Sequence, residues 1–195
     1  MKLYFIRHGE TDWNLLGKIQ GSHDIPLNET GLRQAEELSR RLIEQGYRFT
    51  KIYTSQQQRA FKTAEILSQY VNMEVTPVKG LEEVNLGDWE GLSWSEVKLK
   101  FPEEYNAWYH NRRYARAPRG ESYQDLLDRL LPAIHTILQT NSDHVAIVTH
   151  GAVVMSLQCY LTDTPFQEMK KFAPENTAVV EIDSGMFVQE GHRAL

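Results

Sequence analysis

An arginine and a histidine, Arg7 and His8, follow directly after the first apolar run of the chain, at 3–6. In an open α/β sheet, ligands bind outside the carboxyl ends of the strands, so this position makes both residues candidates for a site. A neutral imidazole can attack phosphorus, and a guanidinium is always charged and suited to holding phosphoryl oxygens. By itself, Arg-His-Gly is equally compatible with an ordinary junction between a strand and a turn. Three later segments add weight to the chemical interpretation.

A second histidine, His150, lies in the same kind of place, after the apolar run 145–149 and before a glycine. Two such histidines at strand ends are expected to share one phosphoryl group. Arg59 follows a short β-prone run at 51–54 and falls in the first turns of an expected helix, where free N–H groups and the dipole favour anions. It is a candidate second phosphate ligand, and the alternative is an exposed helical arginine.

The segment 81–92 supplies carboxylates beside a turn, including Glu82, Glu83 and Glu90. A phosphoester leaving group needs a proton, and a glutamic acid partly desolvated under a lid can supply one. Surface acidity is the alternative reading, most plainly for Glu82 and Glu90.

Strand and helix signals alternate along the rest of the chain. The β-prone runs lie at 2–6, 51–54, 74–78, 145–149 and 177–182, and helical spacing is found at 30–45, 57–71, 122–139 and 152–161. This alternation predicts an α/β fold, a three-layer α/β/α sandwich with a mostly parallel sheet.

The ends of the expected helices carry capping signals. Thr30 is predicted to cap one helix and Gly46 to close it in a left-handed conformation. Ser122 and Asp125 form a capping-box pattern before another helix. Pro132 is expected to kink or break that helix.

The stretch 92–121 fits the alternation poorly and is predicted to be a small helical cap inserted into one domain that spans 1–195. It holds two tryptophans, three tyrosines and four arginines, with no acid between Tyr105 and Gly120. Trp108, Tyr109 and Arg116 are its predicted substrate contacts, and the alternative is a solvated basic loop. The aromatic side chains favour an apolar leaving group, whereas the arginines would favour a second anionic group if they face inward.

Bulk composition narrows the class of protein. A chain of 195 residues with 41% hydrophobic and 24% charged residues fits one globular domain. The net charge of −5 argues against nucleic-acid binding by bulk electrostatics. The apolar run before Arg7 is too short for a signal peptide or a membrane span, so the cytoplasm is expected and no membrane partner is. The single cysteine, Cys159, excludes an internal disulfide and is expected to be a buried structural thiol.

Several motifs occur in a fixed order from residue 2 to about 188. They are Arg7-His8-Gly9-Glu10-Thr11-x-x-Asn14, Gln20-Gly21, Pro26-Leu27-x-x-x-Gly31, Thr54-Ser55 to Arg59-Ala60-x-x-Thr63-Ala64, Leu81-x-Glu83-x-x-x-Gly87-x-Trp89-Glu90-Gly91, Gly120-Glu121-Ser122 and Thr149-His150-Gly151. This series resembles the histidine phosphatase superfamily in its phosphoglycerate-mutase-like branch, and most of all the small bacterial broad-specificity phosphatases.

The resemblance implies roles for the matching positions. His8 matches the nucleophile, Glu83 the proton donor and His150 the second histidine. The phosphate-binding arginines correspond to Arg7 and Arg59, and further site contacts to Asn14 and Gln20. Glu82 stands where Arg or Asn is common in the family, which counts against a substrate that needs positive charge there.

The expected function is therefore hydrolysis of small phosphorylated metabolites through a phosphohistidine, without a metal or another cofactor. A cofactor-dependent phosphoglycerate mutase and an α-ribazole phosphatase are the enzymatic alternatives. A phospho-ligand binding protein on the same fold would be expected to have lost His8 or Glu83, and both are present. A homodimer is left open.

Overall fold

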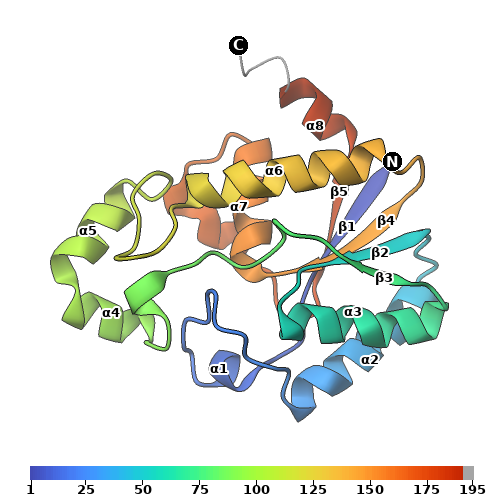
Figure 1. The fold of residues 1–195 in the computed structure, drawn as a ribbon, viewed down its shortest axis with the longest axis horizontal. Helices are drawn as coiled ribbons and strands as arrows, with labels where there is room; N and C mark the ends of the chain where they lie inside the picture. Colours follow the sequence, from blue (N-terminus) through green and yellow to red (C-terminus); the bar gives the residue numbers. More distant parts are fainter. Residues whose placement is uncertain (191–195) are drawn as a thin grey trace.

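Five strands form one twisted sheet in the computed structural model, which describes residues 1–190 (Figure 1). The order across the sheet is β3-β2-β4-β1-β5. The strands are β1 (Lys2–Arg7), β2 (Lys51–Thr54), β3 (Val75–Pro77), β4 (Val145–Thr149) and β5 (Val179–Asp183). Neighbours pair in parallel except β5, which runs antiparallel to β1 at the edge. The predicted mostly parallel sheet is confirmed.

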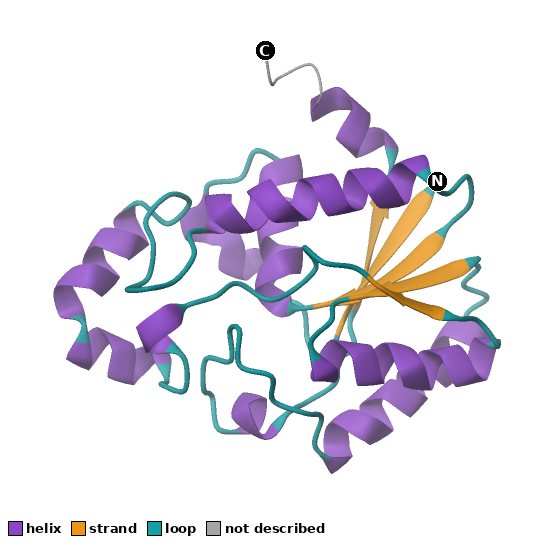
Figure 2. Ribbon diagram, viewed as in Figure 1, coloured by secondary structure: helices purple, strands orange, loops and turns teal. Residues whose placement is uncertain are grey.

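Helices cover both faces of the sheet, as the three-layer prediction requires (Figure 2). α2 (Glu29–Glu44) and α3 (Gln58–Val71) lie on one face, and α6 (Tyr123–Gln139) and α7 (Gly151–Leu161) on the other. Successive side chains of a strand point to opposite faces. Accordingly, Leu3 and Phe5 pack in the core with α6 and α7, whereas Tyr4 and Ile6 pack with α2 and α3.

Two of the predicted capping features are confirmed and one is corrected. Gly46 has φ +73°, just past the end of α2, and the Ser122 capping box opens α6. However, α2 is capped by Asn28, whose side chain accepts a hydrogen bond from the Gly31 N–H at 2.8 Å, so Thr30 already lies inside the helix. α6 continues through Pro132, so the predicted break, one of two expected outcomes, does not occur. The helical turns before and after this proline are both anchored in the core.

The predicted cap is helical. It contains α4 (Trp94–Lys100) and α5 (Pro102–His110), which lie beside the sandwich at the left of Figure 1, after the short 3-10 turn η1 (Gly87–Trp89). Its interior is a cluster of aromatic rings: Trp108 lies 5.3 Å from Trp89 and 5.4 Å from Trp94 between ring centroids. Aromatic pairs at such spacings stabilise beyond the area that they bury. The cap is therefore held by packing of its rings on one another and on Trp89 of η1.

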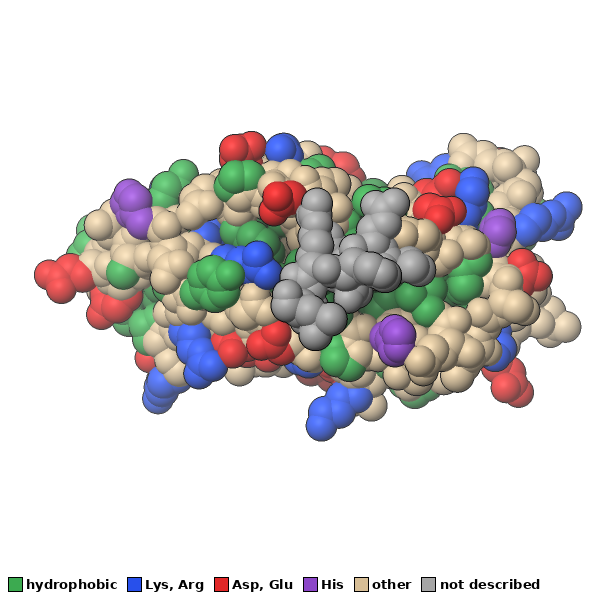
Figure 3. Space-filling model, turned by 90° about the horizontal axis from the view of Figure 1, so that it is seen from above, with side chains coloured by type: hydrophobic (Ala, Val, Ile, Leu, Met, Phe, Trp, Pro, Cys, Tyr) green, Lys and Arg blue, Asp and Glu red, His purple; other side chains and the backbone are tan. Residues whose placement is uncertain are grey.

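The remaining described elements are α1 (Asp12–Leu15), the 3-10 segment η2 (Phe166–Phe172) and α8 (Gly185–Glu190). No helix within residues 1–190 is long and apolar enough to cross a membrane. Acidic and basic side chains are interspersed on the face that Figure 3 shows, so this face carries no broad patch of one charge.

Candidate active site

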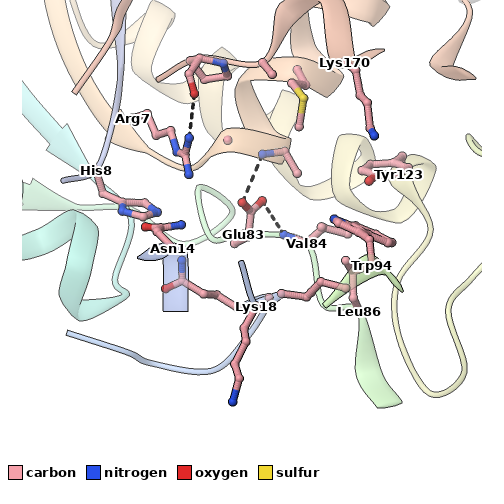
Figure 4. A pocket seen from close by; sticks show the side chains of 18 of the residues that line it. Arg7, His8, Asn14, Lys18, Glu83, Val84, Leu86, Trp94, Tyr123 and Lys170 are labelled. Carbon is pink, nitrogen blue, oxygen red and sulfur yellow. Dashed lines mark hydrogen bonds between the residues drawn. The ribbon is translucent and has the colours of Figure 1, made fainter. Parts of the chain in front are cut away.

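The carboxyl ends of β1 and β4 bring the two predicted histidines together. The strands pair in parallel with Arg7 opposite Thr149, so His8 and His150 leave the sheet side by side. Their ring centroids are 5.2 Å apart. A cavity of about 400 Å³ opens in front of them, and six predicted site residues line it: Arg7, His8, Asn14, Gln20, Arg59 and Glu83 (Figure 4). His150 is fully buried behind this lining.

His8 is held as a neutral imidazole with a defined proton position. Its Nδ1 lies 2.6 Å from the carbonyl oxygen of Gly9, which can only accept a hydrogen bond, so Nδ1 carries the proton. Burial, followed by the charges of Arg59 and Arg7, holds the pKa of His8 well below its ordinary value of 6.5. Nε2 is therefore unprotonated at neutral pH and is the nitrogen able to attack phosphorus.

The backbone around His8 is fixed by three distant segments. Its N–H donates to the carbonyl of Thr149 at 3.0 Å, and its carbonyl accepts from the side chain of Asn176 at 3.0 Å. Gly9 must be glycine, because a Cβ there would lie 2.5 Å from the carbonyl oxygen of Gly31 in α2. The loop that carries His8 therefore packs directly against α2.

Two arginines, the buried Arg59 and the partly buried Arg7, present free donors beside His8. Arg59, in the first turn of α3, uses Nη1 and Nη2 on the carbonyls of His23 and Gly21, at 2.7 and 2.9 Å, and its Nε has no partner. Arg7 donates from Nη1 to the carbonyl of Pro174 at 2.7 Å, and its Nε is equally unpartnered. Each guanidinium keeps unused N–H groups in a fixed fork, which suits bidentate contact with phosphoryl oxygens.

Burial lowers the pKa of Arg7 and Arg59, while the Glu83 carboxylate acts in the opposite direction on both. Arginine stays protonated in proteins. The pair therefore supplies two positive charges beside the unprotonated nitrogen of His8.

His150 is hydrogen-bonded to Ser55, which directly follows β2 and has no predicted role. His150 Nε2 and Ser55 Oγ are 2.8 Å apart, and both residues are fully buried. Burial and then the charge of Arg59 hold the pKa of His150 well below 6.5. Its Nδ1 has no partner among the described residues, so the neutral ring retains one unused polar atom.

Glu83 is the carboxylate that reaches the cavity. Its Oε1 accepts from the Val84 N–H at 3.0 Å, and its Oε2 from the Ala152 N–H at 3.2 Å, at the N-terminus of α7. Glu82 turns away: its carboxylate accepts from the Gly80 N–H and lies 3.7 Å from Arg129. Of the two neighbouring acids, only Glu83 lines the site.

Arg129 of α6 clamps the loop that carries Glu83. It donates to the carbonyls of Gly80, Glu82 and Glu83, at 3.1, 2.9 and 3.0 Å. It also forms two hydrogen bonds of 3.0 Å with the carboxylate of Glu121. This loop has no regular secondary structure, so a single guanidinium replaces the support that a helix or strand would give.

Asn14 and Gln20 line the cavity with their side-chain oxygens already engaged. Thr11 donates to Asn14 Oδ1 and to Gln20 Oε1, the latter at 2.9 Å. Neither side-chain NH₂ group donates to a partner within residues 1–190, and both residues line the cavity. Each amide can therefore offer N–H groups to a bound oxyanion.

The three predicted cap contacts lie off the cavity. Trp108 is 1% exposed within the aromatic cluster, Tyr109 stacks on Tyr105 and is exposed, and Arg116 pairs with Asp125 at 2.7 Å. Each of these side chains packs or pairs within the cap or against α6. The prediction that they contact the substrate is therefore corrected. The cap and its surroundings contribute other lining residues, which include Trp94, Arg112, Tyr123, Met155 and Lys170.

Among residues 1–190, no group of three or more His, Cys, Asp or Glu side chains is arranged to hold a metal ion. The thiol of Cys159 is buried, and burial raises its pKa to about 11. Its position and its pKa agree with the predicted structural role and leave it out of the site.

The mostly parallel sheet and the two buried histidines at its edge, with two arginines near His8, define an α/β enzyme site for phosphoryl transfer through a histidine. The chain belongs to the histidine phosphatase superfamily (branch 1), whose family model matches residues 3–188.

Relatives in sequence agree with this membership. Phosphoglycerate mutase-like protein 4 of Arabidopsis thaliana is 37% identical over 159 residues, 80% of this chain and 69% of that protein. The metal-independent phosphoserine phosphatase of the same plant is 35% identical over 83% of this chain and 68% of its own length. The chain also matches human 6-phosphofructo-2-kinase/fructose-2,6-bisphosphatase 3, at 35% identity, but spans only 31% of that protein.

Solved structures share the fold. YhfR of Bacillus stearothermophilus has a TM-score of 0.82 and 34% identity, covering 94% of this chain and 92% of that one. The similarity extends over the sandwich and the cap, because so little of either chain is left uncovered.

Proposed function

We propose that the protein hydrolyses small phosphomonoesters through a phosphohistidine formed on His8. The observation that carries this proposal is the neutral imidazole with its proton on Nδ1, which leaves Nε2 free beside the guanidiniums of Arg7 and Arg59. The relative named as a metal-independent phosphoserine phosphatase supports the same class of reaction.

In the first step, Nε2 of His8 attacks phosphorus, and the bond between phosphorus and the ester oxygen breaks. The carboxyl of Glu83 gives its proton to the departing alcohol. The guanidiniums of Arg7 and Arg59 offset the charge on the equatorial oxygens, with additional hydrogen bonds from Asn14 and Gln20. Such positioning and electrostatic stabilisation dominate phosphoryl transfer.

In the second step, the Glu83 carboxylate takes a proton from a water molecule, whose oxygen attacks phosphorus. The bond between phosphorus and Nε2 breaks, which returns neutral His8, a protonated Glu83 and inorganic phosphate. His150 is proposed to contact the transferring group through its unpartnered Nδ1, with Ser55 fixing the ring.

Phosphoglycerate mutase chemistry is the leading alternative, since it would use the same nucleophile and return the phosphoryl group to a second hydroxyl. The test is a set of assays with chelator present and 2,3-bisphosphoglycerate absent. We expect phosphate release from p-nitrophenyl phosphate and several small phosphomonoesters, with negligible interconversion of 3- and 2-phosphoglycerate. Isomerisation that requires the bisphosphate primer, with little phosphate released, would overturn the hydrolase assignment. Efficient and selective hydrolysis of α-ribazole phosphate would instead favour the second alternative.

We also propose that the protein is cytoplasmic and that it forms a homodimer. The inert, buried thiol is compatible with a reducing compartment, where structural disulfides are rare. Cell fractionation tests the location, and analytical ultracentrifugation of the purified chain tests the dimer.

A further inference from the structure

A buried glutamine, Gln57, connects two segments that form the site. It lies between β2 and α3 and is 8% exposed. Its Nε2 donates to the carbonyl of Gly21 at 2.9 Å, and its Oε1 accepts from the backbone N–H of Glu83 at 2.8 Å. A carbonyl can only accept and a peptide N–H can only donate, so these partners fix the orientation of the amide. Gln57 does not line the cavity, so its effect on the reaction must pass through these two partners.

Both partners belong to segments that hold proposed site residues. The Gly21 carbonyl also accepts from Nη2 of Arg59 at 2.9 Å, so one oxygen is shared by Gln57 and the proposed phosphate-binding arginine. Glu83 is the proposed proton donor, and its carboxylate reaches the cavity (Figure 4). The amide of Gln57 therefore bridges the anchor of the arginine and the backbone of the acid.

The backbone of Glu83 is held by side chains, because its loop has no regular secondary structure. Its N–H donates to Gln57, and its carbonyl accepts from Nη2 of Arg129 at 3.0 Å. These bonds come from two different places, the start of α3 and the middle of α6. A general acid must lie within hydrogen-bond distance of the leaving oxygen, so a shift of this backbone would slow proton transfer.

The other end of the bridge is fixed as well. Gly21 has φ +51°, and a Cβ at this position would collide with the carboxylate of Glu90. The same carboxylate accepts from the Ser22 N–H at 2.8 Å and from the Leu86 N–H at 2.9 Å. The Gly21 carbonyl is therefore held in one place, from which the bridging amide can set the position of the acid.

The side chain of Gln57 has no role in its own helix. Gln57 is the N-cap residue of α3, yet its side chain makes no capping hydrogen bond, and glutamine is not among the residues favoured at this position. A buried amide is costly unless it is hydrogen-bonded. The two bonds to Gly21 and Glu83 satisfy it, so its contacts are with the site rather than with the helix.

We propose that Gln57 is a positioning residue for proton transfer to the leaving group. It holds the backbone of Glu83 at a set distance from the carbonyl that anchors Arg59, so that the carboxyl and the guanidinium meet the same phosphoester. This inference rests on the proposed function. It adds to the reaction a residue that touches neither the substrate nor the transferring group.

The first test is the dependence on the leaving group in Gln57→Met, which keeps the length of the side chain and removes both hydrogen bonds. We expect kcat for glycerol 3-phosphate to fall roughly 10-fold, a part of what a general acid contributes. For p-nitrophenyl phosphate kcat should fall much less, because nitrophenolate leaves without a proton, and KM should change little for either ester. Gln56→Met, at the exposed neighbouring position, is the matched control and should keep both rates. Equal losses on the two esters in Gln57→Met would overturn the proposal.

A double-mutant cycle shows whether Gln57 acts through Glu83. In the Glu83→Gln protein the proton donor is already lost, so adding Gln57→Met should lower kcat for glycerol 3-phosphate by less than about 2-fold. If the two losses multiply instead, Gln57 acts independently of Glu83 and the proposal is wrong.

Gln57→Glu keeps the shape of the side chain and provides a second variant. A carboxylate cannot donate to the Gly21 carbonyl, whereas a protonated carboxyl can. Relative to the wild-type protein at the same pH, its kcat for glycerol 3-phosphate should be low at about pH 7.5 and should recover as the pH falls toward about 5. A low ratio that does not change with pH would contradict the bridge. No phosphate release from either ester by the wild-type protein would refute the proposed hydrolase activity itself, which separates the two failures.

Discussion

The two ends of the cavity are stabilised in different ways. At the phosphoryl end, His8, Arg7 and Arg59 are held by backbone groups, namely the carbonyls of Gly9, Pro174, Gly21 and His23. In the cap, side chains hold one another: rings pack on rings, and surface arginines pair with surface acids. Hydrogen bonds to the backbone fix the position and direction of each charged group, whereas packing between rings stabilises the cap without aiming a polar group at the cavity.

This difference explains which residue types can be interpreted functionally. A charged residue at the carboxyl end of a strand is directed toward the cavity by the sheet, so its residue type indicates the chemistry that it can perform. An aromatic or basic side chain of the cap is as often a part of the cap's own structure. Substitutions should therefore change catalysis steeply at the phosphoryl end and change mainly stability or selectivity in the cap.

Glu83→Gln should give the largest effect that depends on the substrate. General acid catalysis contributes roughly 10²- to 10⁴-fold, and a nitrophenolate leaves without a proton. The variant should therefore lose far more activity on an alkyl phosphate than on p-nitrophenyl phosphate. Glu82→Gln is the control, because its carboxylate faces away from the cavity. If Glu82→Gln shows this substrate dependence and Glu83→Gln does not, the assignment of the proton donor is wrong.

Arg59→Lys should lose on the order of 10²-fold in kcat, nearly as much as Arg59→Ala, as when a transition-state donor is removed. A lysine cannot bond two backbone carbonyls and also present a fork to phosphoryl oxygens. Arg40→Lys, at an exposed position of α2, is the matched control and should keep normal kinetics. Near-normal turnover in Arg59→Lys would support the exposed-arginine interpretation that burial of this side chain argues against.

Trp108→Ala tests the cap side of the comparison. Removing a fully buried tryptophan should lower the free energy of unfolding by about 3–5 kcal/mol, measured by urea denaturation. Tyr109→Ala, where the side chain is exposed, should cost much less. The control is kcat for p-nitrophenyl phosphate, measured on fully folded Trp108→Ala protein. If this kcat falls as steeply as in Arg59→Lys, then the cap does not act mainly on stability and selectivity, and the comparison is wrong.

Acid should destabilise the phosphoryl end through its histidines. Their pKa values lie well below 6.5 in the folded chain, so below pH 6.5 the unfolded chain binds more protons and stability falls as the pH drops. Each histidine contributes at most about 1.4 kcal/mol per pH unit. His150→Asn should therefore reduce the dependence of unfolding free energy on pH between about 5 and 6.5, and the exposed His135→Asn should not. An unchanged slope in His150→Asn would show that His150 is not held neutral by burial.

Local patterns in the sequence predicted the sandwich and most of the phosphoryl end. The alternation of strand and helix signals predicts the layers. The carboxyl ends of parallel strands meet at one edge of the sheet, so the sequence also predicts that His8 and His150 lie close together. The resemblance to the family distinguished Glu83 from Glu82, since the loop that carries them has no periodic signal. Arg129, which clamps that loop, could not be predicted because its role depends on contacts with a segment far away in the chain.

The cap was harder to predict because the orientation of its side chains depends on which ring packs on which. Trp108, Tyr109 and Arg116 have residue types suited to a substrate contact, yet each is oriented by neighbours within or beside the cap. Arg112 belongs to the same run and faces the cavity, and Lys170 reaches the cavity from a segment that carried no chemical signal.

The central claim is that His8 carries the phosphoryl group, and direct trapping tests it. The wild-type protein is incubated briefly with substrate labelled in the phosphoryl group, quenched in alkali and digested, and the labelled peptide is identified. Phosphorus bonded to nitrogen is stable in alkali and labile in acid, so the label should be on His8, should be lost on acidification and should be absent from His8→Ala. Label on another residue, or full hydrolytic activity in His8→Ala, would contradict the account.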